Sequence, residues 1–206
     1  MLFEAFDSIY LRTGTSKEAL SVSARPEIAD VRQVLDEYGG ATYEDGLYRF
    51  LSSHDAPRWT QALERFFPTE SGDVEAFAQD WQGNLFGYRD RSNPAVLLFQ
   101  IGSGDVFEIS ESITAFHNEE LVEHPEEALS ISLWREWRLN ESWSLNSDDC
   151  VAYKNPLFLG GEVAIQNLTR ANVEVYWETI GQLLAQVRDL PEGTAVSHIK
   201  LQIQSE

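Results

Sequence analysis

The chain has 206 residues, and its 34 acidic and 15 basic side chains give a formal net charge of −19 and an isoelectric point of about 4.4. A field of that sign repels nucleic acids and anionic membranes and attracts basic partners. The 43% hydrophobic content is too high for a disordered acidic tail. We therefore expect a globular protein that does not bind DNA directly.

Three segments show the periodicity of amphipathic helices. The first covers residues 26–38, with Pro26 in its first turn; the second covers residues 55–66; and the third follows the cap residue Asn172. The apolar positions of the three faces are Ile28, Val31, Val34, Leu35 and Tyr38; Trp59, Leu63 and Phe66; and Val173, Tyr176, Trp177, Ile180, Leu183, Leu184 and Val187. We expect these faces to pack against a common core.

Strand patterns lie between these helices. Residues 44–51 combine a turn with alternation, residues 74–90 add further strands, and residues 95–110 predict a hairpin around a Gly-Ser-Gly-Asp turn. After Ser110 a helix is predicted to start at Pro125, with an apolar face formed by Leu129, Leu133, Trp134 and Trp137. The expected fold class is α+β: a mixed or antiparallel sheet packed with several amphipathic helices in a single compact two-lobed module.

Four stretches carry a resemblance to a known family. They read YGGATYEDGLYRF, NLFGYRDRSNPAVLLFQIGSGDVFEI, FHNEELVEHPEEAL and DDCVAYKNPLFLGGEVAIQNL, the last followed by a helix containing VYW. In order and spacing, from about Pro26 to Leu184, the chain resembles the immunity proteins of bacterial type VI secretion DNase toxins. The resemblance implies a GAD-like α+β region at residues 1–112 and a C-terminal immunity-type α+β region at residues 113–206, packed together as one unit.

The resemblance also implies a function. The chain is expected to be an antitoxin that binds a DNase effector, without catalysis and without a cofactor. A single cysteine cannot form an internal disulfide, the first residues lack the pattern of a signal peptide, and no apolar run approaches the ~20 residues of a membrane span. We therefore expect a cytoplasmic protein.

Cys150 raises the alternative of an enzyme with a thiol nucleophile. A reactive thiolate needs a nearby cation, histidine or helix N-terminus, whereas Asp148 and Asp149 would raise the pKa of the thiol by repulsion. Neither a GxGxxG pattern nor a Gly-Lys-Ser/Thr sequence follows it. We interpret Cys150 as a small apolar residue in a buried strand, with Leu157 to Leu159 returning to the core after an Asn-Pro turn.

A second enzymatic alternative uses a metal ion. His117, Glu119, Glu120 and His124 could supply ligands if a turn brought them together. Their spacing lacks the pairing at i and i+4 of a His-Glu-x-x-His helix, so we expect these histidines to be solvated at the surface. Trp134, Trp137 and Trp143 could form a ligand cage, but the helical spacing of the first two favours a core face.

The distribution of charge points to a partner-binding segment. From Ser92 to Trp134 the sequence contains no Lys or Arg, whereas a solvated face usually mixes both signs. The candidate partner-binding residues in this segment are Glu108, Glu111, Glu119, Glu120, Glu123, Glu126 and Glu127. The leading hypothesis is a cytoplasmic immunity protein that occludes a basic DNase toxin; a small hydrolase or metal-dependent enzyme and an acidic adaptor for another basic protein remain as alternatives.

Overall fold

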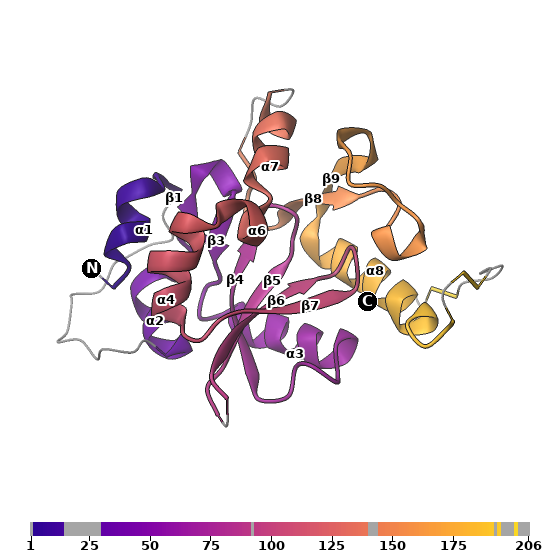
Figure 1. Cartoon of the computed structure of the whole chain (residues 1–206), viewed down its shortest axis with the longest axis horizontal. Coiled ribbons are helices and arrows are strands. Elements are labelled where there is room, and N and C mark those ends of the chain that lie inside the picture. The colour runs from indigo at the N-terminus through magenta and orange to yellow at the C-terminus, as the bar shows by residue number, and fades with distance from the viewer. Residues whose placement is uncertain are drawn as a thin grey trace.

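We describe the protein from a computed structural model, which describes residues 2–14, 30–91, 93–139, 144–191, 193–194 and 200–201. Its main feature is a seven-stranded antiparallel sheet in which each strand pairs with the next along the chain (Figure 1). The strands are β1 (Arg12–Gly14), β2 (Thr42–Tyr43), β3 (Tyr48–Phe50), β4 (Val74–Asp80), β5 (Leu85–Arg89), β6 (Ala95–Gln100) and β7 (Asp105–Ser110). A separate antiparallel pair is formed by β8 (Asp149–Tyr153) and β9 (Leu168–Asn172).

Helices cover both faces of the large sheet. The longer ones are α1 (Glu4–Ile9), α2 (Val31–Tyr38), α3 (Ala56–Phe66), α7 (Ile131–Arg138) and α8 (Val173–Val187). Between β7 and α7 lie α4 (Ile113–Ala115), the π-helical turn η2 (Phe116–Glu120), α5 (Leu121–Glu123) and α6 (Pro125–Leu129). Three 3-10 turns complete the described elements: η1 (Glu44–Gly46), η3 (Leu157–Leu159) and η4 (Ile165–Asn167). No helix in the described part of the chain is long and apolar enough to span a membrane.

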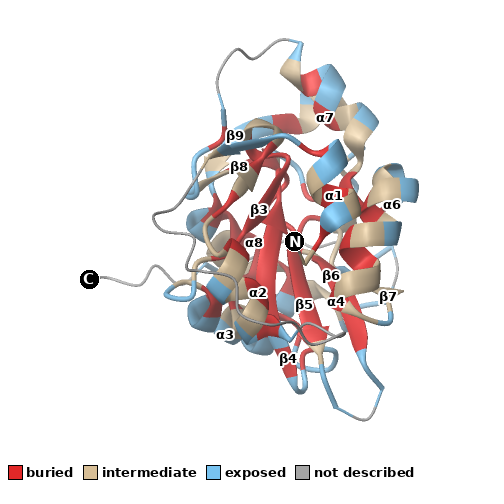
Figure 2. Ribbon diagram, turned by 90° about the vertical axis from the view of Figure 1, so that its left-hand side faces the viewer, coloured by how far each residue is buried: buried red, intermediate tan, exposed pale blue. Residues whose placement is uncertain are grey.

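The run AVLLF in β6 shows how the sheet separates two cores. Val96 and Leu98 belong to one core, whereas Ala95, Leu97 and Phe99 belong to the other. Successive side chains of a strand point to opposite faces, so a continuous apolar run indicates a strand that is covered on both sides. Figure 2 accordingly shows β3 to β6 buried and the outer faces of the helices exposed. The predicted α+β class is confirmed.

Both cores combine residues from before and after residue 112. The first joins α1 and α2 to the segment from α4 to α7, and the second joins α3 to β8 and α8. Figure 1 shows α1, α2 and α4 on one flank of the molecule and α8 on the other. The predicted boundary falls in the connection between β7 and α4, where the chain leaves the sheet. The division into regions 1–112 and 113–206 stays a prediction.

Several predicted elements are confirmed. The strands within residues 74–90 and the hairpin at residues 95–110 form as expected. The side chain of Asn172 caps α8, since its Oδ1 accepts hydrogen bonds from the backbone N–H groups of Glu174 at 3.1 Å and Val175 at 3.0 Å. Trp59, Leu63 and Phe66 are buried on α3. Trp134 and Trp137 are buried on α7 and pack with their ring centroids 5.6 Å apart.

Three local predictions differ from the structure. The first helix begins at Val31, because Asp30 caps it by accepting a hydrogen bond from the backbone N–H of Gln33; Pro26 and Ile28 lie outside the described residues. The helix expected from Pro125 is two helices, because Ser130 adopts a left-handed conformation with φ of 49° between them. The Leu-Phe-Leu stretch is a half-buried 3-10 turn, from which Phe158 packs against the second core.

Candidate functional site

The seven predicted acids lie along one stretch of short elements. Glu108 is on β7, Glu111 follows it, Glu119 and Glu120 are on η2, Glu123 is on α5, and Glu126 and Glu127 are on α6. Six of them are exposed and Glu120 is half-buried. The reason is local: each short helix turns its apolar residues to the first core, and these residues are Ile113, Phe116, Leu121, Ala128 and Leu129. The acids are left on the outer side, which we call the acidic surface.

Two of these acids are already engaged within the protein. The Glu108 carboxylate pairs with the Arg89 guanidinium at 2.8 Å. A Glu126 oxygen accepts a hydrogen bond from the backbone N–H of Ser132 at 3.0 Å and so holds the start of α7. None of the other five acids is in an ion pair with a described residue. Their charges are therefore the ones that an incoming cationic surface would meet without competition.

His117 is not solvated, so the surface assignment was wrong. Its side chain is completely buried, and its ring stacks on Phe3 with a centroid distance of 3.9 Å and on Phe50 at 5.1 Å. The Nδ1 group lies 2.8 Å from the carbonyl oxygen of Ile113, to which it must donate, so Nε2 accepts the hydrogen bond from the Tyr48 hydroxyl at 2.9 Å. The π-helical geometry of η2 turns this histidine inward, and no spacing rule signals that.

The histidines and glutamates of this segment therefore do not converge. Both ring nitrogens of His117 are occupied within the core, while His124 is exposed. Within the residues that the structure describes, no three His, Cys, Asp or Glu side chains are grouped so as to hold a metal ion.

Burial of His117 makes the stability of the protein sensitive to acid. Burial lowers the pKa of its imidazole from 6.5 to about 3, so below pH 6.5 the unfolded chain binds a proton that the folded chain does not. Stability is therefore lost as the pH falls from 6.5 towards 3. We expect His117 to account for a loss of about 1.5 kcal/mol between pH 6.5 and pH 5.

Urea unfolding at the two pH values measures this contribution. His117→Gln lowers stability at both pH values, but it should remove the part of the pH dependence that His117 contributes. His124→Gln is the matched control, because His124 is exposed and its substitution should leave the pH dependence of the wild type unchanged. An equal pH dependence in the His117 variant and the wild type would contradict the assignment of a neutral, buried imidazole.

Cys150 lies in a closed environment. Its side chain is fully buried in β8, and Gly83 packs so closely that a Cβ added there would lie 3.3 Å from the Sγ. The pKa of the thiol is raised to about 12, mainly by burial; the Arg49 guanidinium lowers it, and Asp80 and Asp149 contribute smaller increases. The predicted burial in a strand is confirmed, and the thiol is both protonated at neutral pH and out of reach of a substrate.

Cys150→Ala should cost on the order of 1 kcal/mol, because it truncates a small buried group, and it should not disturb the toxin neutralisation that the family resemblance implies. Chemical denaturation and a nuclease-inhibition assay with the same protein sample measure the two effects. A variant that is fully folded but no longer protects would show that the thiol takes part in function.

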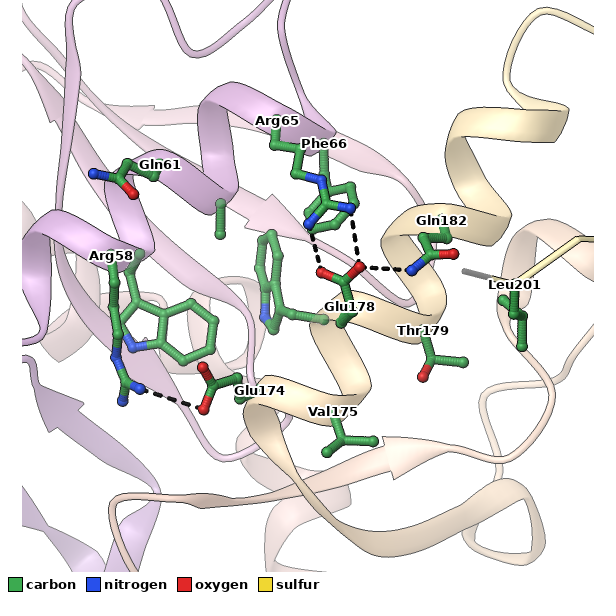
Figure 3. Close-up of a pocket in the computed structure, with 13 residues that line it drawn as sticks. Arg58, Gln61, Arg65, Phe66, Glu174, Val175, Glu178, Thr179, Gln182 and Leu201 are labelled. Atoms are coloured by element: carbon green, nitrogen blue, oxygen red, sulfur yellow. Dashed lines mark hydrogen bonds and ion pairs between the residues drawn. The ribbon is translucent and has the colours of Figure 1, made fainter. Parts of the chain in front are cut away.

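A groove runs between α3 and α8, with a volume of about 740 Å³. Figure 3 shows the ion pairs across it: Arg58 with Glu174 at 3.3 Å, and Arg65 with Glu178 at 2.6 Å. Gly181 allows the two helices to approach, since a Cβ there would lie 2.4 Å from the Phe66 ring. The groove therefore lies on a seam that joins the two halves of the sequence.

A second hollow, of about 490 Å³, lies beside the buried Arg49. The Arg49 guanidinium donates hydrogen bonds to the carbonyl oxygens of Asp80, Asn146 and Asp149. These bonds connect β3 and β4 with the start of β8. Arg49 thus acts as a clamp between the large sheet and the small one.

The ion pairs of the groove and the burial of Arg49 were not predicted from the sequence. A signal existed for the groove, because Arg58 and Arg65 are seven residues apart and Glu174 and Glu178 four apart, which places each pair on one helix face. Nothing local could show that the two faces meet. Trp143, named above for a possible ligand cage, lies outside the described residues.

These features define a class of protein: an antiparallel α+β fold that presents an acidic surface on short helices next to a sheet edge. Residues 116–184, about a third of the chain, match the family model described as "T6SS immunity protein Tdi1, C-terminal", where T6SS is the type VI secretion system. Over these residues the chain is similar to the C-terminal domain of a type VI secretion immunity protein, in agreement with its resemblance to that family. The match does not include the N-terminal region, whose GAD-like character stays a prediction.

The chain was also compared with curated proteins and with solved structures. No curated protein matches the sequence. Among solved structures, the chain is similar to the crystal structure of Atu4351 from Agrobacterium tumefaciens, with 11% identity and a TM-score of 0.48, over 68% of this chain and 69% of that one.

Proposed function

We propose that this chain neutralises a basic DNase effector of a type VI secretion system in the cytoplasm, by binding it without catalysis and blocking its access to DNA. The proposal rests mainly on the overlap, along the sequence, of the family match with the acidic surface. The immunity-family match begins at Phe116, where the helical part of the acidic surface also begins, and includes Glu119, Glu120, Glu123, Glu126 and Glu127.

The physical basis is charge complementarity. A DNase needs a positive surface to hold phosphates, and a protein with a net charge of −19 and a cluster of exposed acids is attracted to that surface. Such attraction accelerates encounter and disfavours wrong partners, whereas the affinity comes mainly from a few buried apolar or aromatic anchors. Inhibition by occlusion requires no chemistry from this chain.

The buried thiol supports the non-catalytic reading. Cys150 has no accessible Sγ, and His117 uses both ring nitrogens within the core. Of the side chains named in the enzymatic alternatives, Cys150 and His117 therefore present no exposed reactive or metal-binding group. Glu119 and His124 are solvated, and Glu120 is half-buried.

The test combines a cellular and a purified assay. The toxin to use is the nuclease encoded next to this gene. We expect co-expression of the chain to restore growth of cells that produce this toxin, and the purified chain to stop plasmid cleavage at a one-to-one molar ratio. An unrelated nuclease of similar basicity is the control, because a merely acidic protein would inhibit both. Undiminished plasmid cleavage by the adjacent nuclease in the presence of excess chain would refute the proposal.

A further inference from the structure

The last strand of the large sheet, β7, has an outer edge with which no strand in the described part of the chain pairs. Its inner edge pairs with β6, with Leu98 opposite Phe107 and Leu97 opposite Glu108. Its residues make no backbone-to-backbone hydrogen bond to a described residue outside β6, and the N–H of Asp105 at its start donates to the Ser103 Oγ at 3.3 Å. Every second residue of such a strand directs its N–H and C=O groups outward, where another extended segment can pair with them.

Phe107 is the second unusual feature of this edge. It is 47% exposed, and it is the only aromatic side chain in the described part of the chain that is exposed rather than buried or half-buried. It projects from the sheet on the same face as Leu98, the face that carries the first core and η2. An exposed aromatic residue on a rigid strand has the properties of an interface anchor.

The edge is held in place by the C-terminal part of the chain. At the turn between β6 and β7, a Cβ added to Gly102 would lie 2.7 Å from the Tyr153 ring, and one added to Gly104 would lie 2.6 Å from Leu184. η2 contacts β7 on the side of the first core. Because neighbouring elements fix the strand, a partner that pairs with it loses less free energy to ordering.

The charges beside the edge select the kind of partner. Asp105 and Glu111 are exposed at its two ends, and the acidic surface continues from them along η2 and α5. Two copies of this chain pairing through β7 would place acid against acid, which is unfavourable for directly opposed residues. A basic segment that pairs with β7 would instead place its cationic side chains next to these acids, which is favourable.

The geometry points to β7 as the docking edge for an extended, basic segment of the toxin, which adds to the sheet as an eighth strand. The pairing region is Asp105 to Glu108, because the register between β6 and β7 shifts beyond Glu108. Asp105 and Phe107 share one face of β7, so the segment carries a Lys or Arg opposite Asp105 and an apolar side chain that covers Phe107 on that face. This inference rests on the proposed function and names the surface that performs it.

A pair of double variants tests the docking edge. Asp105→Lys with Phe107→Ser reverses the charge and removes the anchor, and both side chains are exposed, so the fold should survive. The matched control is Glu162→Lys with Val163→Ser, which changes an exposed acid and an apolar side chain that is 65% exposed between β8 and β9. The probe is a catalytically inactivated form of the toxin encoded beside this gene, and circular dichroism and thermal melting confirm that both variants are folded.

We expect the edge variant to bind the toxin about 30-fold more weakly than wild type and the control to bind it like wild type. Hydrogen exchange of the wild-type complex should show slowed exchange of backbone amides within Asp105 to Glu108, which an added strand protects and a contact by side chains alone does not. Equal affinity of the edge variant and wild type, or unchanged exchange in this strand, would contradict docking at β7. Neither outcome would contradict the proposed function.

Two other outcomes are distinguishable. A wild-type chain that does not bind the toxin refutes the proposed function itself. A wild-type dimer that the edge variant converts to a monomer, measured by light scattering, would make β7 a surface for self-association and overturn the assignment of a basic segment to it.

Discussion

Trp177→Ala should lower the free energy of unfolding by about 3 to 5 kcal/mol, as expected for removal of a large buried aromatic side chain. The Trp177 side chain is 1% exposed, and its ring contacts Trp59 at 5.9 Å and Phe67 at 6.0 Å between centroids. Its Nε1 donates a hydrogen bond to the carbonyl oxygen of Gly83 at 2.6 Å, which would be left buried and unpaired. A loss of this size is a large fraction of the stability of an ordinary domain.

Thermal melting measures the effect, which should lower the midpoint by roughly 6 to 20 °C in a chain of this size. Val175→Ala is the matched control, since Val175 lies two residues away on α8 but is 64% exposed, and its truncation should change stability by less than about 0.5 kcal/mol. An unchanged midpoint for Trp177→Ala would show that this ring is not part of the second core.

The same helix shows why part of the fold is predictable from sequence. Periodicity and the cap residue Asn172 are local signals, and they define α8 and its buried face before any contact is known. The two-sided burial of β6 is also local, because its apolar run is continuous instead of alternating. Elements whose hydrophobic period and end signals agree are therefore predicted correctly, and the α+β class follows from them.

The errors occur where tertiary contacts overrule local pattern. His117 lies in a polar, acidic sequence, yet the π-helical turn and the aromatic rings of Phe3 and Phe50 enclose it completely. The break at Ser130 replaces one predicted helix with two. The buried Arg49 donates hydrogen bonds to the carbonyl groups of Asn146 and Asp149, which are 97 and 100 residues away, and no short window of sequence contains that information.

Phe107 illustrates the same limit at the candidate site. Alternation predicts a strand that contains Val106, Phe107 and Ile109, but not which side of that strand lacks a neighbour. Only the strand order places β7 at the edge, and only the burial of the other described aromatic residues makes its exposed ring distinctive. The acids could be found because a segment without Lys or Arg can be recognised from the sequence alone. Which of these acids form contacts within the protein can be determined only from the structure.

Reversal of the four unpaired acids on η2, α5 and α6 should slow association with the toxin at least about 10-fold at low ionic strength, and the rate of dissociation should change less. The variant replaces Glu119, Glu120, Glu123 and Glu127 with Lys. Glu126 is spared because it holds the start of α7 through the backbone N–H of Ser132. The fold should survive, because three of the four side chains are exposed, the fourth is half-buried, and none is in an ion pair with a described residue.

The control must separate the position of the charges from their number. Replacement of Asp36, Glu64, Glu70 and Glu75 with Lys changes the net charge by the same amount, at exposed positions on α2, α3, β4 and the connection between α3 and β4. Steering by the acidic surface predicts a slow rate for the first variant and a rate closer to wild type for the second, with the difference shrinking as salt shortens the Debye length to about 8 Å at 0.15 M. Stopped-flow mixing with the inactivated toxin at several salt concentrations measures these rates. Equal association rates for the two variants would mean that only the total charge attracts the toxin and that the acidic surface is an ordinary solvated face.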